Sequence, residues 1–255
     1  MDAPASVMLF AAGLAGGVVT AIVGGASLLT FPALLATGLP AIVANASNTV
    51  ALTPANLVAA LADLERRPRW DRTFVGLAAV SVAGSVVGAV LLLLTPDKAF
   101  TALVPVLIGM ATVLFALSNP IRLWIASRAT TTGRRRSPAS IGTLLFVPVA
   151  VYGGYFGAGM SVLILAILAI SRDGEFRANN VIKNLLSGLT SLLAVAVFVH
   201  QGVVAWAPTL VVMAGGLLGG FAGGRLVRVL PADLVRAIVI TVGTVLTVIY
   251  TWRYW

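Results

Sequence analysis

Gly153-Gly-Tyr-Phe-Gly-Ala-Gly159 interrupts an apolar segment that covers residues 139–171. A membrane-spanning helix needs ~20 apolar residues, so this segment is too long for one span and too short for two. Clustered glycines break helices, because glycine loses more backbone entropy than other residues when it becomes helical. We therefore predict either a kinked single helix or a re-entrant pair of half-helices, which enters and leaves a membrane on the same side.

A second segment of this kind lies near the N-terminus, where Gly24-Gly-Ala-Ser27 interrupts residues 7–37. The other apolar segments are 41–62, 73–94, 99–118, 178–199, 203–224 and 233–252. Hydrophobic residues make up 59% of the chain and charged residues 10%, whereas soluble domains have roughly 45–50% and about 25%. The chain is therefore predicted to be an all-α integral membrane protein, with most of its length in the lipid bilayer.

Several classes of function are disfavoured by what the chain lacks. It has one histidine and no cysteine, which excludes disulfides and a cysteine or histidine metal cluster. The net charge of +9 comes from arginines placed between apolar segments, as the positive-inside rule expects, so nucleic acid is not a predicted partner. The interiors of the apolar segments hold no Asp or Glu, and no phosphate-binding Gly-rich loop occurs, which argues against a carboxylate-lined cation path and an ATP-driven motor. We expect no cofactor and no enzymatic activity.

The charges of the loops bear on the topology. If segments 7–37 and 139–171 are re-entrant, nearly all Lys and Arg residues of the loops lie on the cytoplasmic side, and only Lys98 and Arg253 remain outside. The positive-inside rule favours this arrangement over eight plain crossings. It gives each half three crossings, so the second half starts on the opposite side from the first. This is the inverted-repeat plan of many secondary transporters.

The predicted organisation has three parts, namely a first membrane repeat of residues 1–118, a cytoplasmic basic linker of residues 119–140 and a second membrane repeat of residues 141–255. The linker contains Arg134-Arg-Arg136, which either fixes the topology or contacts anionic lipid headgroups. Polar pairs recur between the halves at an offset of 135, namely Asn45 with Asn180, Asn48 with Lys183, and Thr49 with Asn184. At an offset of 134 the pairs are Gly25 with Gly159 and Ser27 with Ser161.

The polar residues of segments 41–62 and 178–199 recur at spacings of three and four, so each set lies on one helix face. Such stripes face protein or a water-filled path, or serve as hydrogen-bonding contacts between helices. Lys183 lies near the start of its segment. We interpret it as a fixed positive charge that attracts an anion, because an ammonium group inside a bilayer is costly. Snorkelling to the interface, or an ion pair with Asp173 or Glu175, is the alternative.

The glycine breaks provide a second means of binding an anion. A half-helix that begins inside the membrane turns unpaired backbone N–H groups and the positive end of its dipole toward the cavity. Residues 27–36 and 160–170 are apolar enough to form such half-helices, with Ser27 and Ser161 near their N-termini. The predicted substrate-binding residues are Gly24, Gly25, Ser27, Asn45, Asn48, Thr49, Gly157, Gly159, Ser161, Asn180, Lys183 and Asn184.

These motifs together resemble the TauE/SafE sulfite exporter family of membrane transporters. The stretches that carry the resemblance are Gly13-Leu-Ala-Gly-Gly17, Gly24-Gly-Ala-Ser27, Gly38-Leu-Pro40, Gly153-Gly-Tyr-Phe-Gly-Ala-Gly159 and Gly202-Val-Val-Ala-Trp206. The resemblance covers nearly the whole chain apart from the linker. The first break departs from the family pattern, since Ala26-Ser27 stands where glycine is common.

The resemblance implies transport of small sulfur-containing anions such as sulfite, thiosulfate or organosulfonates across the inner membrane of a bacterium. It also implies that the glycine breaks and the helices after them form the binding site. We therefore expect a secondary transporter, an exporter or permease, that works by alternating access. An anion channel and a non-transporting membrane scaffold subunit are the alternatives. The coupling ion, a proton or sodium, and the oligomeric state are left open.

Overall fold

The computed structural model describes residues 2–22, 25–61, 72–129, 139–171, 176–226 and 232–255, which form helices and no strand. The helices are α1 (Ala3–Ile22), α2 (Ser27–Ala36), α3 (Ala41–Leu61), α4 (Arg72–Leu94), α5 (Asp97–Ala129), α6 (Ala139–Tyr155), α7 (Met160–Ser171), α8 (Phe176–His200), α9 (Trp206–Leu226) and α10 (Ala232–Tyr254). Both predicted glycine breaks separate two helices, α1 from α2 and α6 from α7. The all-α prediction is confirmed for these residues.

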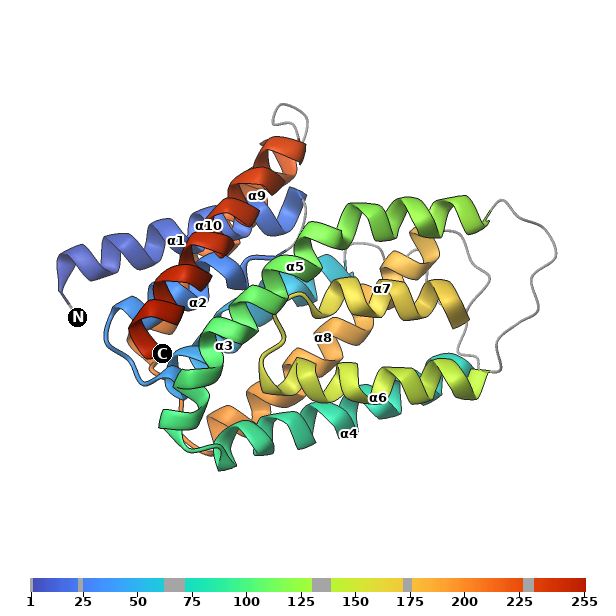
Figure 1. Cartoon of the computed structure of the whole chain (residues 1–255), viewed down its shortest axis with the longest axis horizontal. Helices are drawn as coiled ribbons and strands as arrows, with labels where there is room; N and C mark the ends of the chain where they lie inside the picture. Colours follow the sequence, from blue (N-terminus) through green and yellow to red (C-terminus); the bar gives the residue numbers. More distant parts are fainter. Residues whose placement is uncertain (1, 23–24, 62–71, 130–138, 172–175, 227–231) are drawn as a thin grey trace.

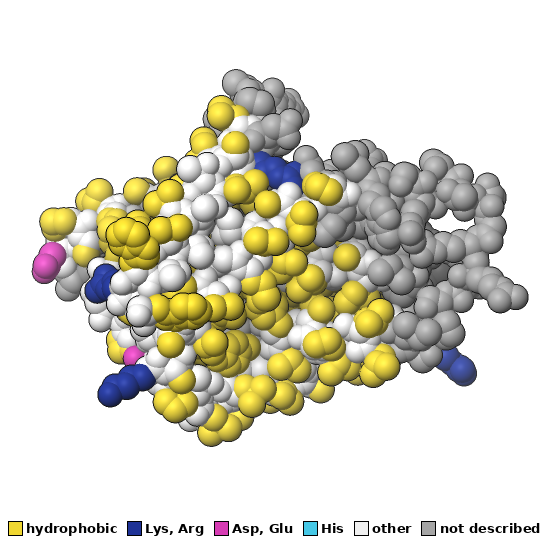
Figure 2. Space-filling view, viewed as in Figure 1, with side chains coloured by type: hydrophobic (Ala, Val, Ile, Leu, Met, Phe, Trp, Pro, Cys, Tyr) yellow, Lys and Arg dark blue, Asp and Glu magenta, His cyan; other side chains and the backbone are white. Residues whose placement is uncertain are grey.

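Many of these helices match a membrane in length and composition. Among the described residues, the stretches long and apolar enough to cross one are Ala3–Thr20, Arg72–Leu94, Asp97–Ser118, Val181–His200 and Leu234–Tyr254. Figure 2 shows hydrophobic side chains across the middle of the visible face, with the described charged side chains mostly toward its edges. The chain is a multi-pass membrane protein.

Both glycine breaks reverse the direction of the chain. α2 folds back along α1, so that the Thr30 methyl group lies 3.0 Å from the position that a Cβ would take at Gly16. α7 returns beside α6 in the opposite direction (Figure 1). The φ angles of Gly25, Gly157 and Gly159 are 95°, 75° and 78°, values that residues with a Cβ rarely adopt. Each segment therefore forms a hairpin of two helices and not a kinked single helix. The first helix of each hairpin is longer than the predicted half-helix, since α1 has 20 residues and α6 has 17, and α1 is long enough to cross a membrane by itself.

Two pairs of helices, α1 with α9 and α4 with α6, approach to backbone contact. A Cβ placed at Gly17 of α1 would meet the Gly216 carbonyl and would lie 2.6 Å from the Gly220 nitrogen on α9. A Cβ at Gly88 of α4 would lie 2.7 Å from the Tyr155 nitrogen on α6. Small residues permit this approach, which stabilises membrane helix pairs because lipid supplies no hydrophobic force between them.

The substitution Gly17→Ala is expected to lower the stability of the folded protein by about 1–3 kcal/mol, because the added methyl group overlaps the backbone of α9. The measurement is the thermal unfolding temperature of the purified protein in detergent. Gly220→Ala is the matched control on the facing helix, where a Cβ meets no heavy atom within 4 Å. Equal effects of the two substitutions would contradict the assignment of Gly17 to the contact.

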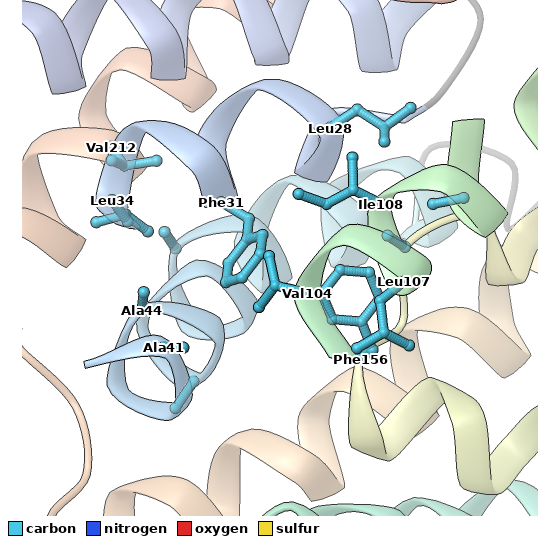
Figure 3. Close-up of a cluster of buried hydrophobic side chains, with 14 of the residues drawn as sticks. Leu28, Phe31, Leu34, Ala41, Ala44, Val104, Leu107, Ile108, Phe156 and Val212 are labelled. Atoms are coloured by element: carbon cyan, nitrogen blue, oxygen red, sulfur yellow. The ribbon is translucent and has the colours of Figure 1, made fainter. Parts of the chain in front are cut away.

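One hydrophobic cluster holds the two halves of the chain together near the breaks. Phe31 of α2 packs edge to face on Phe156, which lies in the second break, with ring centroids 5.3 Å apart and an interplanar angle of 89°. Val104 and Leu107 of α5 belong to the same cluster (Figure 3). The second helix of the first hairpin, α2, is therefore packed directly against the turn of the second hairpin.

α5 is longer than the predicted apolar segment 99–118. It runs from Asp97 to Ala129, 33 residues, and so includes the first part of the predicted linker 119–140. Hydropathy marks where the apolar part of a helix ends and not where its hydrogen bonding ends. Leu, Ile, Ala and Arg all sustain a helix in polar surroundings, which explains the difference.

Candidate functional site

The second break is a turn closed by its own hydrogen bonds. α6 ends where the Tyr152 carbonyl accepts the N–H groups of Phe156 and Gly157, at 2.8 and 3.0 Å. The Tyr152 hydroxyl donates to the Ala158 carbonyl at 2.6 Å, which ties the turn to the last residues of α6. α7 begins where the Met160 N–H donates to the Gly157 carbonyl at 3.2 Å. The start of α7 is thus fixed relative to the end of α6.

Unpaired amides gather at this start of α7. Within the described residues, the N–H groups of Ala158, Gly159 and Ser161 donate no backbone hydrogen bond. The first N–H groups of a helix lack intrahelical acceptors and form the positive end of the helix dipole. Such a group of amides accepts an oxyanion without any further charged residue. The second break is therefore a candidate anion site.

Polar side chains of α8 face the start of α7. The hydroxyl oxygens of Ser161 and Ser187 are 3.5 Å apart. Lys183 and Asn184 precede Ser187 by four and three positions, so all three share one face of α8. Both Lys183 and Asn184 are half-buried, whereas Ser187 is buried. The polar stripe predicted from the sequence thus reaches α7 at Ser187, and Lys183 lies one helical turn before Ser187 on the same face of α8.

Two asparagines of α3, one turn apart, connect the two breaks. Asn48 Oδ1 accepts a hydrogen bond from the Thr30 hydroxyl of α2. Asn45 Nδ2 donates to the Tyr155 carbonyl at the end of α6, at 2.9 Å. The two asparagines are 2% and 1% exposed. Thr49 bonds within its own helix instead, since its hydroxyl donates to the Asn45 carbonyl at 3.0 Å.

A single turn of α5 touches both breaks. The Phe115 ring lies 2.9 Å from the position of a Cβ at Gly25, in the first break. The Leu114 side chain lies 3.4 Å from the corresponding position at Gly159, in the second. Both breaks are therefore in contact with the same turn of α5.

The predicted site residues divide between the two breaks. Gly25 and Ser27 lie at the first break, and Asn48 bonds to the helix that follows it, whereas Thr49 is shown only in a bond within α3. Those at the second break, or on the α8 face that reaches it, are Gly157, Gly159, Ser161, Lys183 and Asn184, and Asn45 joins α3 to it. α3 and α8 pack against each other. Gly24 and the side chain of Asn180 lie outside the described residues.

Sequence reasoning missed the role of a buried arginine. Arg236 of α10 is 8% exposed, and its Nη2 donates to the carbonyls of Phe115, at 3.2 Å, and Ala116 on α5. Pro120 has no N–H to donate to the Ala116 carbonyl four residues before it, so Arg236 supplies a donor that the helix lacks. The sequence signal for this contact is a proline inside a helical stretch.

The substitution Arg236→Met is expected to destabilise the protein by about 1.5–3 kcal/mol, because it removes charged hydrogen bonds to one buried and one part-buried carbonyl. Pro120→Ala restores an N–H within α5, so the effect of Arg236→Met is expected to be smaller in that background. Thermal unfolding of the four variants in a double-mutant cycle measures this coupling. Arg253→Met, at an exposed position of α10, is the control. Additive effects of Arg236→Met and Pro120→Ala would contradict the inference that Arg236 replaces the N–H that Pro120 lacks.

Comparisons with known proteins place the chain among membrane transporter families. The chain matches the family model described as Sulfite exporter TauE/SafE over residues 9–250. A probable membrane transporter protein of Haemophilus influenzae is 29% identical over 244 residues, covering 94% of this chain and 92% of the relative. The probable membrane transporter proteins ORF9 of Sinorhizobium sp and YfcA of Escherichia coli K12 are each 26% identical, covering 94% of this chain and 90% and 87% of the relatives. No solved structure gives a significant match.

Proposed function

We propose that this chain, which belongs to the TauE/SafE sulfite exporter family, is a secondary transporter of small sulfur-containing anions such as sulfite, thiosulfate or organosulfonates. The family and the relatives named as transporters support transport across a membrane. The observation that supports an anionic substrate is the group of N–H donors of Ala158, Gly159 and Ser161 at the start of α7, which make no backbone hydrogen bond within the described residues. Their chemistry fits an oxyanion, which accepts several hydrogen bonds at once.

The α8 stripe adds charge and further donors to this site. The Ser187 hydroxyl lies against Ser161, and Lys183 and Asn184 precede Ser187 on the same helix face. In this proposal the Lys183 ammonium group attracts the anion into the site, and the Asn184 amide donates to one of its oxygens. A positive charge supported by neutral donors selects anions by size and oxygen geometry. Which sulfur-containing anion the protein transports then depends on the space around the second break.

We propose further that the halves 1–118 and 141–255 are inverted repeats that give alternating access. The hairpins α1–α2 and α6–α7 run in opposite directions in Figure 1. The contact of α1 with α9 has its counterpart in the contact of α6 with α4, as expected when the two halves exchange roles. On this proposal the linker 119–140 lies on the cytoplasmic side of a bacterial inner membrane.

A ligand screen tests the substrate class. Thermal unfolding in detergent is measured with potassium salts of sulfite, thiosulfate and sulfoacetate, with taurine, and with small carboxylates as the comparison. We expect saturable stabilisation by at least one sulfur oxyanion, since a ligand that binds only the folded state raises its stability. Stabilisation by carboxylates alone, or by no anion at all, would contradict the proposal that the substrate is a small sulfur-containing anion.

A further inference from the structure

Three tryptophan side chains are exposed at the ends of helices. Trp206 is the first residue of α9 and is 50% exposed. Trp252 and Trp255 lie at the end of α10 and are 87% and 75% exposed. Tryptophan is highly buried on average in soluble proteins, whereas in membrane proteins it gathers where the bilayer meets water. These side chains are therefore candidates for contact with phospholipid.

A contact between α3 and α5 provides a reference for the position of these helix ends. The Asp97 carboxylate, in the first turn of α5, accepts the N–H of Ile42, in the first turn of α3, at 3.4 Å. Both helices therefore begin at the same end of the molecule, and both extend from this reference contact toward the other end (Figure 1).

The end of α10 lies close to the reference contact. The Trp255 indole N–H donates to the Ala102 carbonyl of α5 at 2.9 Å. Ala102 lies ~7.5 Å along α5 from the reference contact. Lys98 precedes Ala102 by one turn on the same helix face, and its side chain is exposed. Arg253 is also exposed, with its guanidinium carbon 5.8 Å from the Tyr254 ring centroid. Aromatic rings and two cations thus lie near one level.

The start of α9 lies at a similar depth. The N–H of Ala205, the residue before Trp206, donates to the Ser47 hydroxyl of α3 at 3.0 Å. Ser47 lies ~7.5 Å along α3 from the reference contact. α9 packs on α1 and α3, whereas α10 packs mainly on α5. The tryptophans therefore recur at one level on separate helix pairs, which is the pattern of a belt and not of a single patch.

We propose that Trp206, Trp252 and Trp255 form an aromatic belt that binds the headgroup region of phospholipids at this end of the molecule. An indole ring suits this region, because its apolar body contacts acyl chains while its polar edge stays near water. The exposed cations Lys98 and Arg253 suit the lipid phosphates. A single protein partner suits the arrangement less well, since it would need the indoles on one face. On the topology proposed above, the belt contacts the outer leaflet.

The belt also fixes the depth of the candidate site. α8 ends at His200, and a short connection joins it to Trp206. Ser187 lies about 20 Å along the axis of α8 from His200, at 1.5 Å per residue. Because the hydrocarbon layer is ~30 Å thick, the contact of Ser187 with Ser161 lies in its interior. Substrate sites of secondary transporters lie at this depth.

Fluorescence quenching of single tryptophans in the full chain tests the belt. A variant that retains only Trp252, with Phe at the other tryptophan positions, is placed in phosphatidylcholine vesicles. The acyl chains carry bromine either near the headgroup or near the chain end. We expect bromine near the headgroup to quench more strongly, and aqueous acrylamide to quench in part. A variant that retains only Trp206 is expected to give the same result.

Val245→Trp in the protein without its own tryptophans is the matched control. Val245 is 50% exposed on the same helix, about 10 Å along α10 from Trp252. Its indole is expected to be quenched more strongly by bromine near the chain end. That order of quenching for Trp252 would overturn the proposal, and so would quenching by acrylamide alone. Protection of Trp252 from both lipids and acrylamide would overturn it and indicate that a second copy of the chain covers the end of α10.

The quenching measurement needs no substrate, so it separates this inference from the proposed function. The expected quenching order without transport of any sulfur anion would reject the proposed function and leave the belt intact. Anion transport by a protein whose Trp252 lies in water or in the middle of the bilayer would reject the belt and leave the proposed function intact.

Discussion

Lys183→Ala is expected to reduce anion transport in proteoliposomes about 10- to 100-fold, while the protein still inserts and folds. A hydrogen bond that involves a charged group contributes roughly 1.5–3 kcal/mol, and each 1.4 kcal/mol corresponds to a factor of ten in affinity. The Lys183 side chain is half-buried on the α8 face that reaches the start of α7 through Ser187. The substitution removes the only charged group among the predicted site residues.

Two further variants sharpen the test of Lys183. Lys183→Arg keeps the positive charge and is expected to retain part of the transport, with a change in substrate preference because the guanidinium group is larger and planar. Lys98→Ala removes a lysine from an exposed position on α5 and is expected to have no effect on transport. Transport at the full rate by correctly inserted Lys183→Ala would show that the lysine reaches the interface and does not serve the site.

Gly157→Ala is expected to abolish most substrate binding, because it distorts the turn at the second break. The φ of Gly157 is 75°, and a Cβ there would lie 2.9 Å from the Gly153 carbonyl oxygen. Adopting this conformation destabilises a residue with a Cβ by about 1–2 kcal/mol. Relief of that strain moves the turn and with it the amides of Ala158 and Gly159, which the anion requires in a fixed arrangement.

Gly202→Ala separates the loss of binding from the loss of stability. Gly202 has a φ of 66°, and a Cβ there meets no heavy atom within 4 Å. Both substitutions introduce similar backbone strain, and Gly157→Ala adds a contact of 2.9 Å with the Gly153 carbonyl oxygen, so its unfolding temperature is expected to fall at least as far as that of Gly202→Ala. Only Gly157→Ala is expected to remove the stabilisation by the sulfur anion. Equal retention of ligand binding in both variants would contradict a role of the second break in the site.

The elements that depend on hydrophobic and glycine patterns were predictable from the sequence. The interrupted segments 7–37 and 139–171 form two helical hairpins, because glycine clusters in an apolar stretch act through local backbone conformation. The length of α1, which suffices to cross a membrane, was not predicted. Apolar stretches likewise located the long helices, since their length is set by the bilayer. The end of α5 at Ala129 was not predicted, because a polar composition does not end a helix.

Contacts between distant residues were beyond the reach of the sequence. The polar stripe of α3 was recognised by spacing, but spacing does not reveal that Asn45 bonds the end of α6 while Asn48 bonds α2. The bond of Arg236 to the Ala116 carbonyl depends on how α10 packs on α5. Both contacts supply hydrogen bonds where a helix is interrupted, and only the fold decides which side chain comes near.

Counterflow in proteoliposomes tests the central claim, that the chain carries a small sulfur anion between the two sides of a membrane by alternating access. Vesicles loaded with unlabelled thiosulfate or sulfite are diluted into a trace of the same radiolabelled anion. A carrier is expected to accumulate the label transiently above its external concentration, with a rate that saturates with substrate, and Lys183→Ala vesicles are expected not to. Equilibration of the label without accumulation, at a rate that does not saturate, would contradict the claim and indicate an anion channel.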